Sequence, residues 1–124
     1  MKTILIAITL MLSMTGSAQT YVRSELGASA NWSTYSSKWI YNEPVPLDVL
    51  IVVDSDGLSI PIIDATFRYI SEISDDTEEN AIFLAIDGDG ISCHVILSKY
   101  IDELGFGYIS IMYSSELFKY AYKN

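Results

Sequence analysis

The chain has 124 residues, half of them hydrophobic, and its sixteen Asp and Glu against seven Lys and Arg give a formal net charge of −9. Such a charge disfavours binding to nucleic acid, whose phosphates it would repel, and disfavours adsorption to an anionic membrane surface. A single cysteine excludes an internal disulfide, and one cysteine with one histidine excludes a structural zinc site. The length suits one domain with an apolar core.

The first twenty residues, MKTILIAITLMLSMTGSAQT, have the three parts of a cleavable secretory signal. Lys2 supplies a positive start, residues 4–12 form an apolar run, and small residues end at Ala18 before Gln19. A membrane-spanning helix is the alternative, but the apolar run is far shorter than the roughly 20 residues that cross a bilayer. We therefore predict a signal peptide over residues 1–18, export to the periplasm or the extracellular space, and no membrane insertion after cleavage.

Residues 19–37 are rich in Ser, Ala, Gly and Asn, which indicates a loosely ordered lead-in with one short strand near Tyr21–Arg23. Beyond residue 38 the chain is dominated by β-branched and aromatic residues that alternate with polar ones, and no long segment has a helical stripe. The main alternating runs are residues 47–54, 58–63, 65–74, 91–98, 108–113 and 117–123, and residues 81–87 form a nearly all-apolar run that is typical of a central strand. They predict an all-β domain over residues 38–124, an antiparallel meander of about seven or eight strands that forms a small barrel or half-barrel.

Two nearly identical phrases, VVDSDGLSI and AIDGDGISC, each place a D-x-D-G motif between β-forming runs. An EF-hand calcium loop has this motif, but it also needs an oxygen ligand at position 1 and a glutamate at position 12. With Gly57 at position 6, those two places hold Val52 and Ile63. With Gly90 at position 6, they hold Ala85 and Ile96. Both phrases therefore fail as EF-hands, and neither has the following helix of a phosphate-binding loop.

A hairpin turn explains every residue of the two phrases, because aspartate caps its own turn and glycine adopts a positive φ at low cost. A calcium site of another kind stays open if the two turns meet at one end of the sheet. Its ligands would be four carboxylates, those of Asp54, Asp56, Asp87 and Asp89.

Catalytic motifs are scarce in this chain. Cys93 and His94 are adjacent on a predicted strand, so they point to opposite faces and do not form a nucleophile–base pair. Cys93 falls on an apolar face and is expected in the core. The sequence has no G-x-S-x-G nucleophile motif and no pattern that calls for a cofactor. A secreted hydrolase that uses a pair of carboxylates stays open, although no particular pair is selected.

Aromatic residues are concentrated at the two ends of the predicted domain. Phe118, Tyr120 and Tyr122 share one face of the last strand, and Trp32, Tyr35, Trp39 and Tyr41 lie where the chain enters the sheet. These rings either close the ends of a small β core or form a binding surface. The second interpretation gives the leading hypothesis, a non-catalytic binding domain. Its candidate binding residues are Trp32, Trp39, Tyr41, Phe118, Tyr120 and Tyr122.

The partner of such a surface is an unknown protein, a glycan or a small apolar ligand, and a homo-oligomer also fits the pattern. A lipocalin-like carrier, in which a half-open barrel encloses a small apolar ligand, is the principal alternative.

The order of a signal ending in Ala18-Gln19, then KWIYNEPVPLDVLIVVD, then IDGDGISCHVIL and an aromatic last strand resembles that of small exported proteins of gut Bacteroidales and their phages. The resemblance covers most of the chain after the signal and rests on turn and strand patterns. It implies a small β-sheet domain outside the cytoplasm, and it implies no activity or catalytic residue.

Overall fold

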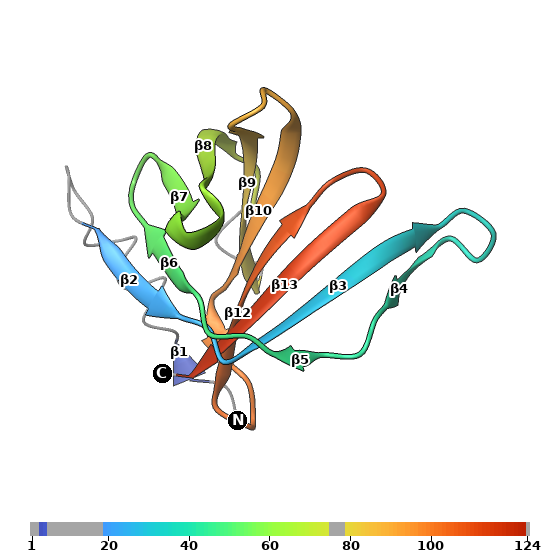
Figure 1. Cartoon of the computed structure of the whole chain (residues 1–124), viewed down its shortest axis with the longest axis horizontal. Helices are drawn as coiled ribbons and strands as arrows, with labels where there is room; N and C mark the ends of the chain where they lie inside the picture. Colours follow the sequence, from blue (N-terminus) through green and yellow to red (C-terminus); the bar gives the residue numbers. More distant parts are fainter. Residues whose placement is uncertain (1–2, 5–18, 75–78, 124) are drawn as a thin grey trace.

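The computed structural model describes residues 3–4, 19–74 and 79–123, and these form an antiparallel all-β fold with one short 3-10 turn (Figure 1). The predicted fold class is therefore confirmed. The predicted signal segment, residues 1–18, lies outside the described residues except for Thr3–Ile4, which pair with Ile101 and Tyr100.

The strands are β1 (Thr3–Ile4), β2 (Thr20–Arg23), β3 (Leu26–Ser33), β4 (Lys38–Tyr41), β5 (Val45–Pro46), β6 (Leu50–Val53), β7 (Gly57–Ile60), β8 (Ala65–Glu72), β9 (Asn80–Asp87), β10 (Ser92–Ser98), β11 (Tyr100–Ile101), β12 (Phe106–Met112) and β13 (Glu116–Lys123). The 3-10 turn η1 (Pro61–Ile63) follows β7, where proline ends the strand. The described residues thus contain more strands than the seven or eight expected, because several are two-residue pairings and two lie in the predicted lead-in.

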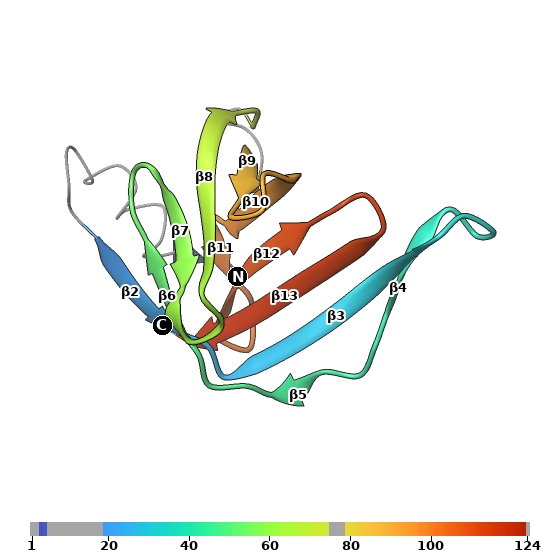
Figure 2. The same ribbon diagram turned by 45° about the horizontal axis from the view of Figure 1, so that its top comes forward.

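The main sheet has the order β2-β6-β7-β8-β9-β10-β12-β13-β3-β4, with β5 paired to β3. From β6 to β13 it is the predicted meander. The consecutive strands β2 and β3 lie near its two opposite ends, so one stretch of chain leaves one half of the sheet and enters the other. The sheet therefore curls into a half-barrel without closing (Figures 1 and 2).

Ser24 forms the bend between β2 and β3, and it is 1% exposed. Its hydroxyl donates to the carbonyl of Leu47 at 2.5 Å and accepts the backbone N–H of Val49 at 3.1 Å. Its own backbone N–H donates to the Val49 carbonyl at 2.9 Å, while the next N–H, of Glu25, donates to the Ala121 carbonyl at 2.8 Å. Ser24 and Glu25 thus connect the segment that precedes β6 to the corner where β3 meets β13.

The structure differs from the sequence prediction over residues 19–37. The short strand expected near Tyr21–Arg23 is present as β2, but the small residues after it form the eight-residue strand β3 rather than a loosely ordered segment. The residues of β3 have low intrinsic β propensity, and the strand forms because its small side chains allow close packing against neighbouring segments. A Cβ on Gly27 would lie 2.5 Å from Leu47 Cδ2, and Ala30 is 1% exposed.

The hydrophobic core lies on the inner face of the curled sheet. Strands from both halves contribute to it, and Ile51, Val95 and Ile109 are completely buried. Its members are Val49, Ile51, Val53, Leu58, Ile60, Phe67, Ala81, Phe83, Ala85, Cys93, Val95, Leu97, Ile101, Ile109, Ile111 and Tyr122. These side chains fill the space between the two halves of the sheet.

The two D-x-D-G motifs are hairpin corners, as predicted. The Oδ1 atom of Asp54 accepts the backbone N–H groups of Asp56 and Gly57, at 2.8 and 2.9 Å. In the same way, the Oδ1 atom of Asp87 accepts the N–H groups of Asp89 and Ile91, both at 2.9 Å. Each aspartate therefore satisfies two backbone donors at the tip of its hairpin.

The glycines of the two motifs serve different purposes. Gly90 has a φ of 81°, the left-handed conformation that was expected. Gly57 does not, so that part of the prediction is wrong for the first motif. It is glycine because β8 passes very close, and a Cβ there would lie 2.1 Å from the carbonyl oxygen of Phe67.

Substituting Gly57 with alanine is expected to lower the free energy of unfolding by about 2 kcal/mol or more, because the strand must move away from β8. The matched control is Gly88→Ala, where the new Cβ would lie 3.5 Å from the nearest atom, Thr66 Oγ1. Urea unfolding of both variants measures the difference. Equal stability of the two variants would contradict this close approach.

Two tyrosine hydroxyls, those of Tyr69 and Tyr122, are buried without a hydrogen-bond partner among the described residues. Replacing Tyr122 with phenylalanine should raise the free energy of unfolding by up to about 1 kcal/mol, because an unsatisfied polar group is removed. Tyr113→Phe is the control, since that hydroxyl donates to Asp87 Oδ2 at 2.7 Å. It should cost about 1 kcal/mol in the same urea titration. A Tyr122→Phe variant as unstable as the control would show that the hydroxyl has a partner.

Candidate functional site

The candidate site lies on the sheet face opposite the core, which we call the outer face. Cross-strand pairing fixes its members, because directly paired residues project to the same side. One continuous row runs across six strands through Leu84, His94, Met112, Leu117, Ala30 and Tyr41. The neighbouring rows cover five of these strands, β9, β10, β12, β13 and β3, and contain Ile82, Ile96, Ser110, Lys119 and Ala28, then Asn80, Ser98, Tyr108, Ala121 and Leu26. Further members are Phe106 opposite Lys123, Trp32 opposite Trp39, and Ser92 opposite Ile86.

The strand positions of this outer face contain no aspartate or glutamate in the described chain. Their charged groups are Lys119 and Lys123, with His94 as a further ionisable residue, and Arg68 of the adjoining strand β8 pairs with Ile86 on the same face. A protein with sixteen acidic residues thus has no carboxylate at the outer-face positions of these six strands. Apolar and positively charged residues without a carboxylate suit an apolar or anionic partner.

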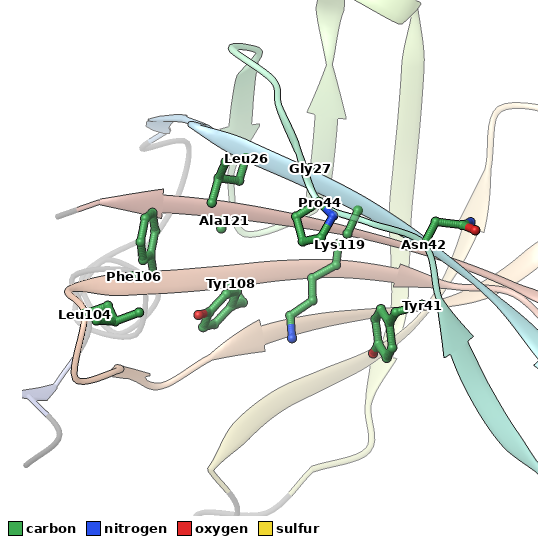
Figure 3. Close-up of a pocket in the computed structure, with 11 residues that line it drawn as sticks. Leu26, Gly27, Tyr41, Asn42, Pro44, Leu104, Phe106, Tyr108, Lys119 and Ala121 are labelled. Atoms are coloured by element: carbon green, nitrogen blue, oxygen red, sulfur yellow. The ribbon is translucent and has the colours of Figure 1, made fainter.

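A groove of about 350 Å³ lies on the outer face (Figure 3). Small side chains of β3 and β13 form its floor, rings of β12 form one wall, and the connection from β4 to β5 forms the other. Its lining residues are Leu26, Gly27, Ala28, Tyr41, Asn42, Pro44, Leu104, Phe106, Tyr108, Lys119 and Ala121.

Lys119 is the charged residue of this lining. Its ammonium lies between two rings, 4.4 Å from the ring centroid of Tyr108 and 5.8 Å from that of Tyr41 (Figure 3). The side chain is partly buried, and no described carboxylate lies within ion-pair distance of it. Cation–π attraction of about 0.5–2 kcal/mol per ring holds the ammonium over the aromatic wall in place of a carboxylate.

Asp102 positions the Tyr108 ring. Its Oδ1 atom accepts the backbone N–H groups of Leu104 and Phe106, at 3.0 and 2.9 Å, while its Oδ2 atom accepts the Tyr108 hydroxyl. The hydrogen bond from Tyr108, followed by those backbone donors, lowers the pKa of Asp102. Burial, with the nearby carboxylate, raises the pKa of Tyr108 to about 12. The phenol therefore remains protonated and the ring orientation is fixed.

The turn that holds Asp102 repeats the chemistry of the two D-x-D-G corners. Asp102 stands three residues before Gly105, whose φ is 88°, as Asp87 stands three residues before Gly90. The shared pattern is therefore D-x-x-G, and it occurs at all three of these hairpins. Sequence reasoning missed the third copy because its second acidic residue is replaced by leucine.

The predicted binding residues divide between the two faces of the sheet. Trp32, Trp39 and Tyr41 lie on the outer face, on the hairpin of β3 and β4 that extends beyond the other strands (Figure 1). The two indole rings pack edge to face with centroids 5.4 Å apart. Of these three residues, only Tyr41 reaches the groove.

The other three predicted residues, Phe118, Tyr120 and Tyr122, lie on the core side of β13. Tyr122 is a member of the core, Tyr120 packs against it, and Phe118 is partly buried. The alternation that the sequence shows is present, but the aromatic face of β13 is the inner one. The structure therefore does not bring the two predicted groups together.

Groove residues that sequence reasoning missed are Lys119, Tyr108 and Phe106. A signal for Lys119 was available: in the run LFKYAYK it alternates with the aromatic residues, so it must occupy the opposite face from them. Tyr108 and Phe106 face the same side as Lys119 because Ala121 and Lys123 pair with them. That register depends on the hairpin between β12 and β13 and is not visible in composition.

The four aspartates considered for calcium lie at the same end of the sheet, on either side of β8. Gly57 pairs with Arg68, and the preceding residue Phe67 pairs with Asp87. Over the described residues, no group of three or more His, Cys, Asp or Glu side chains is arranged to hold a metal ion. The Oδ1 atoms of Asp54 and Asp87 are already occupied by backbone donors.

Cys93 and His94 lie on opposite faces, as expected. Cys93 is 3% exposed in the core, and burial, followed by the charge of Asp87, raises the pKa of its thiol to about 11. A thiol in this state is a poor nucleophile. His94 lies partly buried on the outer face beside Met112.

A smaller pocket of about 150 Å³ has two acidic lining residues, Glu79 and Asp102. Asp102 is already committed to two backbone donors and a tyrosine hydroxyl, and its lowered pKa keeps it ionised at neutral pH. It is therefore unsuited to the protonated, proton-donating role that a carboxylate-pair hydrolase requires.

Comparisons with protein-family models, with curated proteins and with solved structures each returned no match. Among the described residues, no helix has the length and apolar character needed to span a bilayer.

Lowering the pH should destabilise the protein partly through Asp102. Its pKa lies below the ordinary value of 3.8, so as the pH falls through this window the unfolded chain takes up protons before the folded protein does, and folded stability is lost. Asp102→Asn should therefore lose less unfolding free energy than the wild type between about pH 5 and pH 3. Asp89→Asn is the control, because the Asp89 side chain makes no hydrogen bond among the described residues. Identical pH profiles for Asp102→Asn and the wild type would refute this assignment.

Proposed function

We propose that this chain is an exported, non-catalytic binding domain, and that its groove holds a small ligand with an apolar, ring-containing body. The groove itself carries the proposal: a concave site of about 350 Å³ with an alanine floor and aromatic walls. Small-molecule sites typically occupy about 300–1,000 Å³ and combine apolar walls with a few polar groups. The three-part N-terminal pattern of the sequence supports export.

A surface groove is favoured over a carrier cavity because the interior of the half-barrel is filled. Core residues from β6 to β8 pack against those from β9 to β13, and the side chains of Ile51, Val95 and Ile111 are at most 2% exposed. A lipocalin-like carrier needs an enclosed space lined by such residues. The ligand space of this molecule lies instead on the outer face.

Binding is favoured over catalysis by the chemistry of the lining. It includes no aspartate, glutamate, serine, cysteine or histidine. Its ionisable groups are two tyrosines and Lys119, and the raised pKa of Tyr108 keeps that phenol neutral. One N–H of the Asn42 side-chain amide donates to Ser29 Oγ at 2.8 Å, and an amide is neither a nucleophile nor a base at neutral pH. These residues can recognise a ligand but supply no nucleophile paired with a base.

A neutral probe of suitable size, 2-naphthamide, tests the proposal. At roughly 0.3–0.4 kcal/mol per heavy atom, its binding free energy would be about 4–5 kcal/mol, which corresponds to a Kd on the order of 1 mM or slightly below. We expect titration to shift the backbone amide NMR signals of Ala28 and Ala121 on the groove floor. Ala28→Leu, which fills that floor, should weaken binding at least about tenfold, since it removes both space and contact.

Tyr35→Ala is the control for this experiment, because Tyr35 is fully exposed at the tip of the β3–β4 hairpin and lies outside the groove. Its affinity for 2-naphthamide should equal that of the wild type. Absence of binding, or binding that Ala28→Leu leaves unchanged, would refute the groove as the ligand site.

A further inference from the structure

We propose that the natural ligand of the groove is an anion, a carboxylate attached to an apolar body, and that the Lys119 ammonium binds the carboxylate. The inference rests on the proposed function and specifies the chemical class of the ligand. It follows from the placement of the Lys119 ammonium in the groove lining, on a face whose positions in β3, β4, β9, β10, β12 and β13 have no negative charge.

Lys119 has no compensating carboxylate although the protein is strongly acidic. Lysine side chains usually extend to place the ammonium in bulk water. The Lys119 ammonium instead lies 4.4 Å from the Tyr108 ring centroid, and Asp102 fixes that ring through its hydroxyl. Two rings supply part of the stabilisation that an ion pair would give, and they leave the hydrogen-bonding capacity of the ammonium available to a ligand.

The net charge of −9 would repel an anion at long range, but ionic screening limits this effect. At physiological ionic strength the Debye length is about 8 Å, so charges on other faces act weakly at the groove. The Lys119 ammonium is the charged group of the groove lining itself, whereas the ionised Asp102 carboxylate lies outside the lining and accepts the Tyr108 hydroxyl and two backbone N–H groups. The nearby charge therefore decides the preference, and it favours an anion.

A carboxylate fits this site better than a phosphate. Phosphate sites gather several donors, usually arginine or a set of backbone N–H groups at a helix N-terminus. Lys119 is the cation of the groove lining, which contains no arginine, and one of the two N–H groups of the Asn42 amide donates to Ser29. One ammonium matches one negative charge. The apolar body of the ligand then lies along Leu26 and Ala121, toward the Phe106 ring, whose centroid is 5.2 Å from the Lys123 ammonium.

A matched pair of probes tests the inference: 2-naphthoate and 2-naphthamide share one ring system and differ in charge. At neutral pH we expect wild-type protein to bind the naphthoate about tenfold more tightly, as one partly desolvated charge pair would give. Lys119→Gln should remove the preference and leave binding of the naphthamide nearly unchanged, and Lys119→Arg should retain it. Lys38→Gln is the charge-matched control, because Lys38 lies on β4 outside the groove, and its preference should remain wild type.

A second measurement does not depend on any variant: raising the salt concentration should reduce the wild-type preference for naphthoate. Equal affinity for the two probes, or a preference that survives Lys119→Gln, would overturn the carboxylate inference while leaving the groove as a binding site. If neither probe binds the wild-type protein, the proposed function and this inference fail together.

Discussion

The bend at Ser24 is the constraint on which the rest of the molecule depends. Its hydroxyl and backbone bind Leu47 and Val49, and the next residue binds Ala121, so β2 joins one half of the sheet and β3 the other. This connection curls the sheet around one packed interior and leaves the far end of β3, with β4, extended beyond it. Because the inner face is filled, the outer face is the surface on which a ligand site can form.

Asp102 both stabilises a hairpin turn and positions a residue of the groove. One of its oxygens caps the hairpin between β11 and β12, and the other holds the hydroxyl of Tyr108. The ring of Tyr108 in turn lies against the Lys119 ammonium. A motif that serves only as a hairpin corner at Asp54 thus also positions a groove wall at Asp102. The site is therefore built in part from the same interactions that stabilise the fold.

Patterns within short stretches of sequence predicted the parts of the fold that are set by neighbouring residues, namely the strands and their turns. Period-two alternation identified the meander from β6 to β13, and aspartate with glycine identified two hairpin corners. β3 was missed because small residues such as Gly27 and Ala30 have low β propensity, and the close packing that favours them there is visible only in the fold. Likewise, Tyr41 is far along the chain from Tyr108 and Lys119, and the three residues meet only through the register of β12, β13, β3 and β4. Alternation separated Lys119 from the aromatic face of β13, but only the fold shows which face is the core.

The central claim is that the ligand space lies on the outer face and that the interior is packed. Intermolecular nuclear Overhauser effects between bound 2-naphthoate and methyl-labelled protein test it most directly. The account predicts contacts from the naphthyl protons to the methyl groups of Ala28 and Ala121, which form the groove floor. Contacts to Val95 or Ile109, which are completely buried in the core, would show that the half-barrel encloses its ligand and would contradict the account.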